Sequence, residues 1–176
     1  KEVFLEFKEK DDHFRIKTEK LVCIIQKDHL KTRILDHDGN VLNEDEKGFH
    51  WMYDQKTGND IVIMSKKVQS SEHFYGLGDK SCDFNIRGKR LENWGSDKYA
   101  YGKETDPLYK NIPFFMGLHK KMGYGIFFDN SFRAFFCAFK TRWLSHSKIG
   151  RKRMTELISQ LITKVFVEQP WLHKVC

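Results

Sequence analysis

The chain has 176 residues and a formal net charge of +7, and 40% of its residues are hydrophobic. This length suits one domain, or one domain plus an appendage, and it can bury a core without disulfide bonds. The ordinary apolar content argues against a disordered chain. No run of about 18 apolar residues occurs, so no transmembrane segment is predicted.

The positive charge is concentrated at one end of the chain. Residues 140–176 contain eight Lys or Arg and two Glu, so they carry six of the seven net positive charges. Because the rest is nearly neutral, a basic nucleic-acid-binding face is not predicted. The four cysteines include no Cys-x-x-Cys pair, so neither a zinc site nor any other cofactor is expected.

Short β-strands are predicted along most of the chain. They lie at 13–16, 21–25, 30–35, 49–53, 61–64, 73–78, 112–118, 124–128 and 131–139. A turn is predicted at residues 36–40, where Asp-Gly tolerates positive φ, and a polar loop around residues 44–46. Strand-length apolar runs separated by turns are typical of an all-β antiparallel sandwich.

The segment after residue 72 combines glycines with aromatic residues. The pair Gly76-x-Gly78 lacks the third glycine and following helix of a dinucleotide fingerprint, so backbone turns are favoured over phosphate binding. Residues 91–110 form a long polar and aromatic loop between predicted strands. Loops near this length inside a domain are often functional.

The last part of the chain has a different period. An amphipathic helix is predicted from an apolar stripe at Met154, Leu157, Ile158, Leu161, Ile162, Val165 and Phe166, and Pro170 ends it. This basic helix is expected to dock its apolar stripe on the sandwich, and contact with a membrane surface is the alternative.

The central region resembles the N-terminal domain of glycoside hydrolase family 31, the α-glucosidase and α-xylosidase family. The resemblance is carried by Phe74-Tyr75-Gly76-Leu77-Gly78-Asp79, Arg87-Gly88, Trp94-x-x-Asp97, Leu108-Tyr109-x-x-Ile112-Pro113-Phe114 and Tyr124-Gly125-Ile126-Phe127-Phe128-Asp129-Asn130-Ser131. Each motif is weak alone, but five in the expected order are specific. The resemblance covers roughly residues 13–139.

The resemblance implies a galactose-mutarotase-like β-sandwich at residues 1–139 and a non-family tail at 140–176. The tail is either a genuine helix or the product of a frameshifted, truncated or degenerate copy. Family members place a catalytic (β/α)8 barrel after the sandwich, with an Asp nucleophile and a second carboxylate for retaining hydrolysis. A barrel needs at least about 200 residues, many more than residues 140–176 supply. We therefore expect an accessory domain without catalytic residues, inactive alone, whose partners are that barrel and an α-linked oligosaccharide or glycoside.

The resemblance also suggests which residues contact the sugar. A loop of the family's sandwich reaches the active-site rim, and here it corresponds to residues 93–109. Asp97 is the first candidate, since a carboxylate accepts hydrogen bonds from neighbouring hydroxyls, although a turn role is the alternative. Trp94 and Tyr101 are candidates for stacking on a sugar, with core or interdomain packing as the alternative.

Other polar residues of this region are expected to be structural. They are Asp79, Asp129, Arg87, Arg90, His73 and His119. The aspartates are expected to hold turns and the arginines to lie on the surface or pair with loop carboxylates. The histidines would be a mutarotase-like acid/base pair only in a second interpretation, for which no motif places a carboxylate partner. Two alternatives to the accessory domain stay open: a free-standing carbohydrate-binding module and an inactive remnant.

Overall fold

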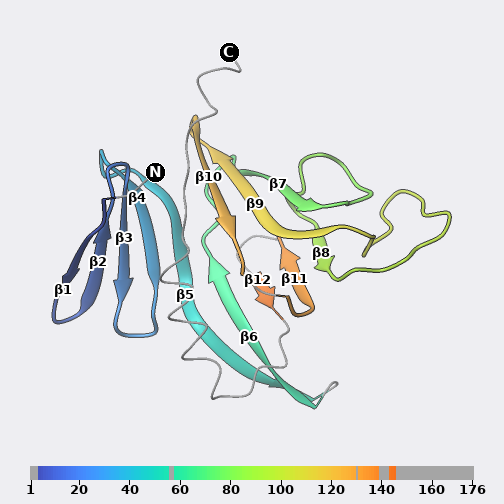
Figure 1. Cartoon of the computed structure of the whole chain (residues 1–176), viewed down its shortest axis with the longest axis horizontal. Helices are drawn as coiled ribbons and strands as arrows, with labels where there is room; N and C mark the ends of the chain where they lie inside the picture. The colour runs from blue at the N-terminus through green and yellow to red at the C-terminus, as the bar shows by residue number, and fades with distance from the viewer. Residues whose placement is uncertain (1–3, 56–57, 130, 139–142, 146–176) are drawn as a thin grey trace.

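The fold consists of antiparallel β-strands (Figure 1). The computed structural model describes residues 4–55, 58–129, 131–138 and 143–145. The strands in this part are β1 (Glu6–Glu9), β2 (His13–Lys17), β3 (Leu21–Gln26), β4 (Thr32–Asp36), β5 (Val41–Asp54), β6 (Asn59–Lys66), β7 (His73–Gly78), β8 (Arg90–Asn93), β9 (Asn111–His119), β10 (Met122–Phe127), β11 (Ala134–Cys137) and β12 (Trp143–Ser145). The predicted all-β antiparallel class is confirmed, while the predicted helix lies outside the described residues.

The described residues form two sheets (Figure 1). The larger has nine strands in the order β1-β2-β3-β4-β5-β6-β12-β11-β8, and the smaller has three in the order β10-β9-β7. The 14-residue β5 joins the two halves of the larger sheet, because its first residues pair with β4 and its later residues pair with β6. Register shifts along β5 mark where the strand bends.

The polar loop predicted around residues 44–46 is wrong, since this segment is the middle of β5. The acidic side chains there are satisfied across the sheet. Asp45 has a fully buried side chain that pairs with Lys66 at 2.6 Å and also accepts a backbone N–H from β4. Glu44 pairs with Arg33 at 2.6 Å on the solvent side. Ion pairing between neighbouring strands therefore allows a strand where composition predicts a loop.

The predicted turn at residues 36–40 is confirmed. One carboxylate oxygen of Asp36 accepts the backbone N–H groups of Asp38 and Asn40, at 3.0 and 2.7 Å. Gly39 has φ of +86°, a conformation that glycine adopts without strain. This Asx-type turn closes the β4–β5 connection.

The strands predicted at 112–118 and 124–128 are confirmed as the hairpin of β9 and β10, whose turn is shorter than the gap between the two predicted ranges. Only Lys120 and Lys121 connect the strands, and both have positive φ, 46° and 62°. Paired positive φ values are typical of two-residue hairpin loops, whose twist matches that of the strands.

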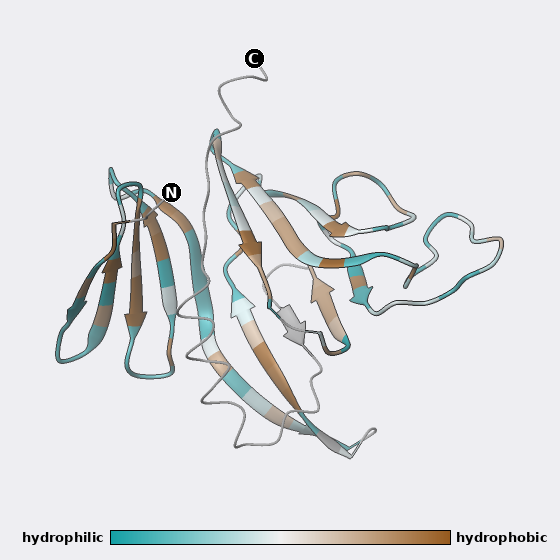
Figure 2. Ribbon diagram, viewed as in Figure 1, coloured by the Kyte–Doolittle hydropathy of each residue, from teal (hydrophilic) through white to brown (hydrophobic). Residues whose placement is uncertain are grey.

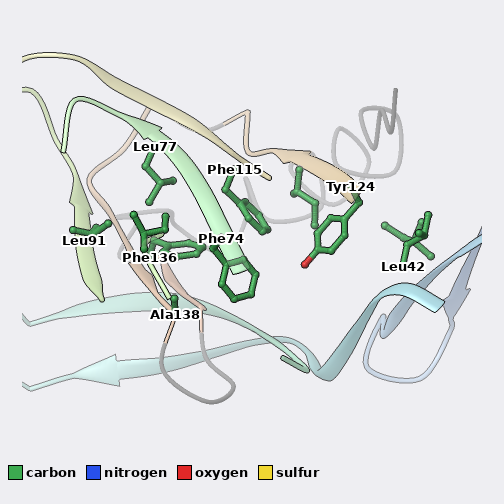
Figure 3. Packing of buried hydrophobic residues seen from close by; sticks show 11 residues of the cluster. Leu42, Phe74, Leu77, Leu91, Phe115, Tyr124, Phe136 and Ala138 are labelled. Carbon is green, nitrogen blue, oxygen red and sulfur yellow. The ribbon is translucent and has the colours of Figure 1, made fainter. Parts of the chain in front are cut away.

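Aromatic rings from both sheets form the core (Figure 3). Phe115 of β9 is fully buried and lies 5.9 Å, between ring centroids, from Phe74 of β7 and 5.4 Å from Phe136 of β11. Leu42 of β5 belongs to the same cluster. Because the cluster includes residues of both sheets, apolar burial holds the two layers together.

A polar bridge crosses this core. Tyr124 donates its hydroxyl to the Glu72 carboxylate at 2.5 Å and accepts the Asn43 side-chain amide at 3.1 Å. Burial, followed by the negative charge of Glu72, raises the pKa of Tyr124, so the phenol stays protonated. The bridge links β10, β5 and the segment that leads into β7.

Candidate functional site

A pocket of about 610 Å³ lies where β8 ends, β9 begins and β10 ends. Its apolar lining includes Trp94, Tyr109, Phe127 and Phe132, and its polar lining includes Asn93 and Asp129. One oxygen, Oδ1 of Asn93, is buried without a protein hydrogen-bond partner. Aromatic walls with a few polar groups are typical of small-molecule pockets.

The loop between β8 and β9 forms one side of this pocket, and a buried lysine anchors it. The side chain of Lys80 is 4% exposed, and its ammonium group donates to the Glu92 carbonyl at 2.6 Å, the Asp106 carboxylate at 2.9 Å and the Asn111 side-chain oxygen at 3.1 Å. Three acceptors match the three donors of an ammonium group. Asp106 also accepts the backbone N–H of Glu92 at 2.5 Å, so both ends of the loop meet at one ion pair.

Further contacts fold the loop back onto the domain. The Ser81 hydroxyl donates to the Gly102 carbonyl at 2.6 Å, and Glu104 pairs with Lys89 at 2.8 Å. Leu108 is 3% exposed and anchors the end of the loop in the apolar interior. The loop thus has a defined conformation, although it contains no regular secondary structure.

Of the three residues predicted to contact a sugar, Asp97 and Tyr101 lie beside Tyr109 but do not line the pocket, whereas Trp94 lines it together with Tyr109. The Tyr101 ring meets the Tyr109 ring edge-on at 6.4 Å, and Trp94, 47% exposed, lines the same pocket as Tyr109. Asp97 is exposed beside the Tyr109 phenol, which donates to the Lys98 carbonyl at 2.6 Å. Partial desolvation, and then the Asp97 carboxylate, raise the pKa of Tyr109. Sequence reasoning missed Tyr109, although it belongs to the Leu108-Tyr109 motif.

Comparison with known proteins identifies the domain. A model of the glycosyl hydrolase 31 N-terminal galactose mutarotase-like domain matches residues 1–136. The chain belongs to this domain family. α-Glucosidase 2 of Bacillus thermoamyloliquefaciens is 33% identical over 130 residues, which are 73% of this chain and 16% of that enzyme. An α-glucosidase of Saccharolobus solfataricus is 35% identical over 75 residues, 43% of this chain and 11% of that enzyme.

A solved structure agrees with this assignment. The glycoside hydrolase family 31 dextranase of Flavobacterium johnsoniae, solved in complex with glucose, matches with a TM-score of 0.61 and 28% identity. The match covers 88% of this chain and 20% of the dextranase chain. This chain therefore spans no more than a fifth of the length of these relatives.

The glycine pair of this family 31 domain has the structural role expected from the sequence. Gly76 and Gly78 have φ of +119° and +82°, and both approach β9 closely. A Cβ atom would lie 2.6 Å from the Phe114 carbonyl oxygen at the first position and 2.4 Å from the Lys110 carbonyl oxygen at the second. Only glycine fits such a backbone contact.

The remaining charged candidates have varied roles. Arg87 donates to the Glu72 carbonyl at 2.5 Å, and Arg90 lies over the Phe135 ring at 4.0 Å. The Asp79 backbone N–H continues the contact between β7 and the start of β9. Asp129, expected to hold a turn, also lines the pocket.

The two histidines do not face each other. His119 is 3% exposed, and its Nε2 lies 2.9 Å from the Leu42 carbonyl oxygen inside the sandwich. His73 is exposed on β7, where its Nδ1 contacts the Asn85 side chain at 2.7 Å. Because His73 pairs in register with Leu118, it lies on the opposite face of the sheet from His119. This geometry gives no support to a mutarotase-like acid/base pair.

The described part of the chain contains free thiols but no cluster of metal-ligating side chains. Among the described residues, no three or more His, Cys, Asp or Glu side chains gather as a metal site, and no helix is long and apolar enough to cross a membrane. Cys23, Cys82 and Cys137 have free thiols. Among the described residues, the pocket beside the loop is the candidate ligand site.

Proposed function

We propose that this chain is the accessory N-terminal domain of a retaining α-glycosidase and that its β8–β9 loop contacts the sugar at the rim of the active site. The catalytic carboxylates would lie on a (β/α)8 barrel outside this chain. Membership of the family 31 domain supports the general role. The observation that carries the finer role is the position of Asp97 and Tyr101 beside Tyr109, which lines the pocket together with Trp94.

Each residue has a separate task in this proposal. The exposed Asp97 carboxylate accepts hydrogen bonds from two neighbouring hydroxyls of the sugar, and such charge-assisted bonds are the stronger kind. The Trp94 ring packs on the apolar face of the sugar. Tyr101 buttresses Tyr109, which forms the wall of the pocket. The substrate is an α-linked glucoside or xyloside, in keeping with relatives named as α-glucosidases and as an α-xylosidase.

The test uses the full chain together with α-glucosidase 2 from which the region matching this chain has been removed. The chain alone should not hydrolyse a chromogenic α-glucoside. In the assembly, Asp97→Ala should raise KM by about 10-fold or more, since hydrogen bonds to charged groups contribute about 1.5–3 kcal/mol. Asp83→Ala is the matched control, because Asp83 is another exposed carboxylate. An unchanged KM for Asp97→Ala would refute the role of this residue.

A free-standing carbohydrate-binding module is the second candidate, and the aromatic lining of the pocket favours it. Calorimetric titration of the full chain with isomaltose and maltose separates the two functions. Saturable binding that Asp97→Ala abolishes favours the module. If the chain alone binds neither sugar, while Asp97→Ala raises KM in the assembly, the accessory domain is favoured. An inactive remnant would show neither effect.

The domain limits are also part of the proposal. The family match ends at residue 136, which supports a sandwich at 1–139 and a basic segment at 140–176 with an amphipathic helix, although Trp143–Ser145 of that segment still pair with the sandwich as β12. Circular dichroism tests this division. Removal of residues 146–176 should reduce the helical signal at 222 nm without changing the β-sheet signal, and equal helical signals would contradict it.

A further inference from the structure

A chain of hydrogen bonds connects the buried Lys80 ammonium group to the part of the β8–β9 loop that carries Asp97. The ammonium group donates to the side-chain oxygen of Asn111 at 3.1 Å. The side-chain nitrogen of Asn111 donates in turn to the Leu108 carbonyl oxygen at 3.0 Å. The backbone N–H of Ser96 donates to the same carbonyl oxygen at 3.1 Å, and Ser96 directly precedes Asp97. Three hydrogen bonds thus lead from the interior of the domain to the backbone beside this carboxylate.

The ammonium group also sets the direction of these bonds. Because an ammonium group carries donors only, it contacts the Asn111 amide through the oxygen, and the amide nitrogen then faces the Leu108 carbonyl oxygen. The ammonium group is itself held by the Glu92 carbonyl oxygen and the Asp106 carboxylate. Loss of the ammonium group would therefore free the Asn111 amide to rotate away from Leu108.

The returning part of the loop holds the backbone on both sides of Asp97. Before Asp97, the N–H of Ser96 is bonded to the Leu108 carbonyl oxygen. After Asp97, the Lys98 carbonyl oxygen accepts the Tyr109 hydroxyl at 2.6 Å. Since Leu108 and Tyr109 are consecutive residues, a shift of Leu108 moves both contacts. The position of Leu108 therefore determines where the exposed Asp97 carboxylate lies.

The same ammonium group binds residues on two sides of the candidate pocket. On one side it binds the Glu92 carbonyl oxygen, and the next residues in the chain, Asn93 and Trp94, line the pocket. On the other side it binds Asn111, which also lines the pocket. The chain is hydrophilic where β8 ends and where β9 begins (Figure 2). One buried charge therefore fixes the separation of these two strand ends.

We propose that Lys80 is a positioning residue for sugar binding: through Asn111 and Leu108 it holds Asp97 where the carboxylate meets the hydroxyls of an α-linked glucoside. This inference rests on the proposed function, and it adds the internal residues that set the geometry of the loop. Lys80 is 4% exposed and acts without touching the sugar. Its replacement should change the affinity for the sugar and leave the rate of bond cleavage unchanged, because the proposed catalytic carboxylates lie on the barrel.

The test measures kcat and KM with the full chain in excess over α-glucosidase 2 from which the matching region has been removed. Lys80→Met should raise KM by about 3- to 30-fold at unchanged kcat, the size of effect expected along such a network. A purely structural role predicts a different result, since partial unfolding lowers kcat through loss of active assembly and leaves KM unchanged. Tyr124→Phe is the matched control, because it removes a hydrogen bond in the core, away from the loop, and should leave KM unchanged.

Asn111→Asp separates the chain of hydrogen bonds from the ion pair. The new carboxylate still accepts from the Lys80 ammonium group, but it has no donor for the Leu108 carbonyl oxygen. KM should therefore rise as it does in Lys80→Met. When either substitution is combined with Asp97→Ala, KM should stay within about twofold of that of Asp97→Ala alone, because a positioning residue acts through the residue that it positions.

The outcomes separate this inference from the proposed function. A rise in KM for Lys80→Met and Asn111→Asp that disappears in the Asp97→Ala background supports the inference. Where Asp97→Ala alone raises KM, an unchanged KM for Lys80→Met overturns the inference and leaves the proposed function standing. A rise that multiplies the effect of Asp97→Ala overturns it in the same way, because Lys80 then acts independently of Asp97. An unchanged KM for Asp97→Ala alone overturns both.

Discussion

Replacement of Lys80 by Met should detach the β8–β9 loop from the domain. The substitution keeps the length of the side chain but removes the ammonium group that binds Glu92, Asp106 and Asn111. Asp106 would then be a largely buried carboxylate, with a side chain 16% exposed, and would keep only the backbone N–H of Glu92. The loop would lose the contact that joins its two ends.

The expected loss of stability is about 3 kcal/mol. Removal of one partner from a buried ion pair costs about 3–5 kcal/mol, and the surviving hydrogen bond to Asp106 favours the lower end. With a urea m-value of about 2 kcal/mol per molar, the unfolding midpoint should fall by about 1.5 M. Such a loss is a large part of the roughly 5–15 kcal/mol that stabilises a domain.

Urea unfolding followed by intrinsic fluorescence measures this change. Lys103→Met is the matched control, because Lys103 forms an exposed pair with Asp83 at 3.4 Å, and its loss should change stability by less than about 0.5 kcal/mol. Limited proteolysis should show faster cleavage of the loop in Lys80→Met only.

A double variant tests the cause. In Lys80→Met with Asp106→Asn, the buried charge is gone, so the two losses should fall short of additivity by about 1 kcal/mol or more. A loss below about 1 kcal/mol for Lys80→Met, or additive losses in the double variant, would show that the ammonium group does not hold the loop.

Three further results are expected. Tyr124→Phe should lower the unfolding free energy by about 1–3 kcal/mol in urea titrations, because the buried Glu72 and Asn43 side chains lose their hydrogen-bond partner. The control Tyr99→Phe, at a residue 98% exposed, should leave the unfolding free energy unchanged. Equal effects of the two variants would contradict the polar bridge. Gly78→Ala should lower the melting temperature more than Gly39→Ala does. Both glycines have positive φ, but only at Gly78 would a Cβ atom meet backbone, namely the Lys110 carbonyl oxygen. Equal losses would rule out this close approach. Burial raises the pKa of the Cys23 thiol to about 11 from an ordinary value of 9.0. The unfolded chain therefore releases this proton at lower pH than the folded chain, and the stability of the fold decreases as pH rises from about 9 to 11. Alkylation of this thiol, followed by peptide mass spectrometry, should rise near pH 11, and a midpoint near pH 9 would refute the burial.

Much of the fold could be predicted from the sequence because it depends on patterns of neighbouring residues. The turn closed by Asp36 and Gly39 and the hairpin of β9 and β10 depend on residues close together in the chain, so their patterns were sufficient. The middle of β5 was misread because Asp45 is stabilised by Lys66, 21 residues later. The short β8 and β12 were also not predicted, since β8 is held by pairing with β11 and β12 by pairing with β6 and β11.

The candidate site shows the same division. Trp94, Asp97 and Tyr101 could be proposed from the resemblance, but no spacing indicated that Asp97 and Tyr101 would lie beside Tyr109. Lys80 gave no sequence signal either, because a lysine becomes an anchor only where three acceptors surround it.

The sequence by itself determined the all-β class, the family 31 membership and the turns, because these depend on residue order and local backbone preference. The tertiary structure decided which polar groups are buried in pairs and where the pocket lies. Those features arise from contacts between residues far apart in the chain, and only the packing of the two sheets brings such residues together.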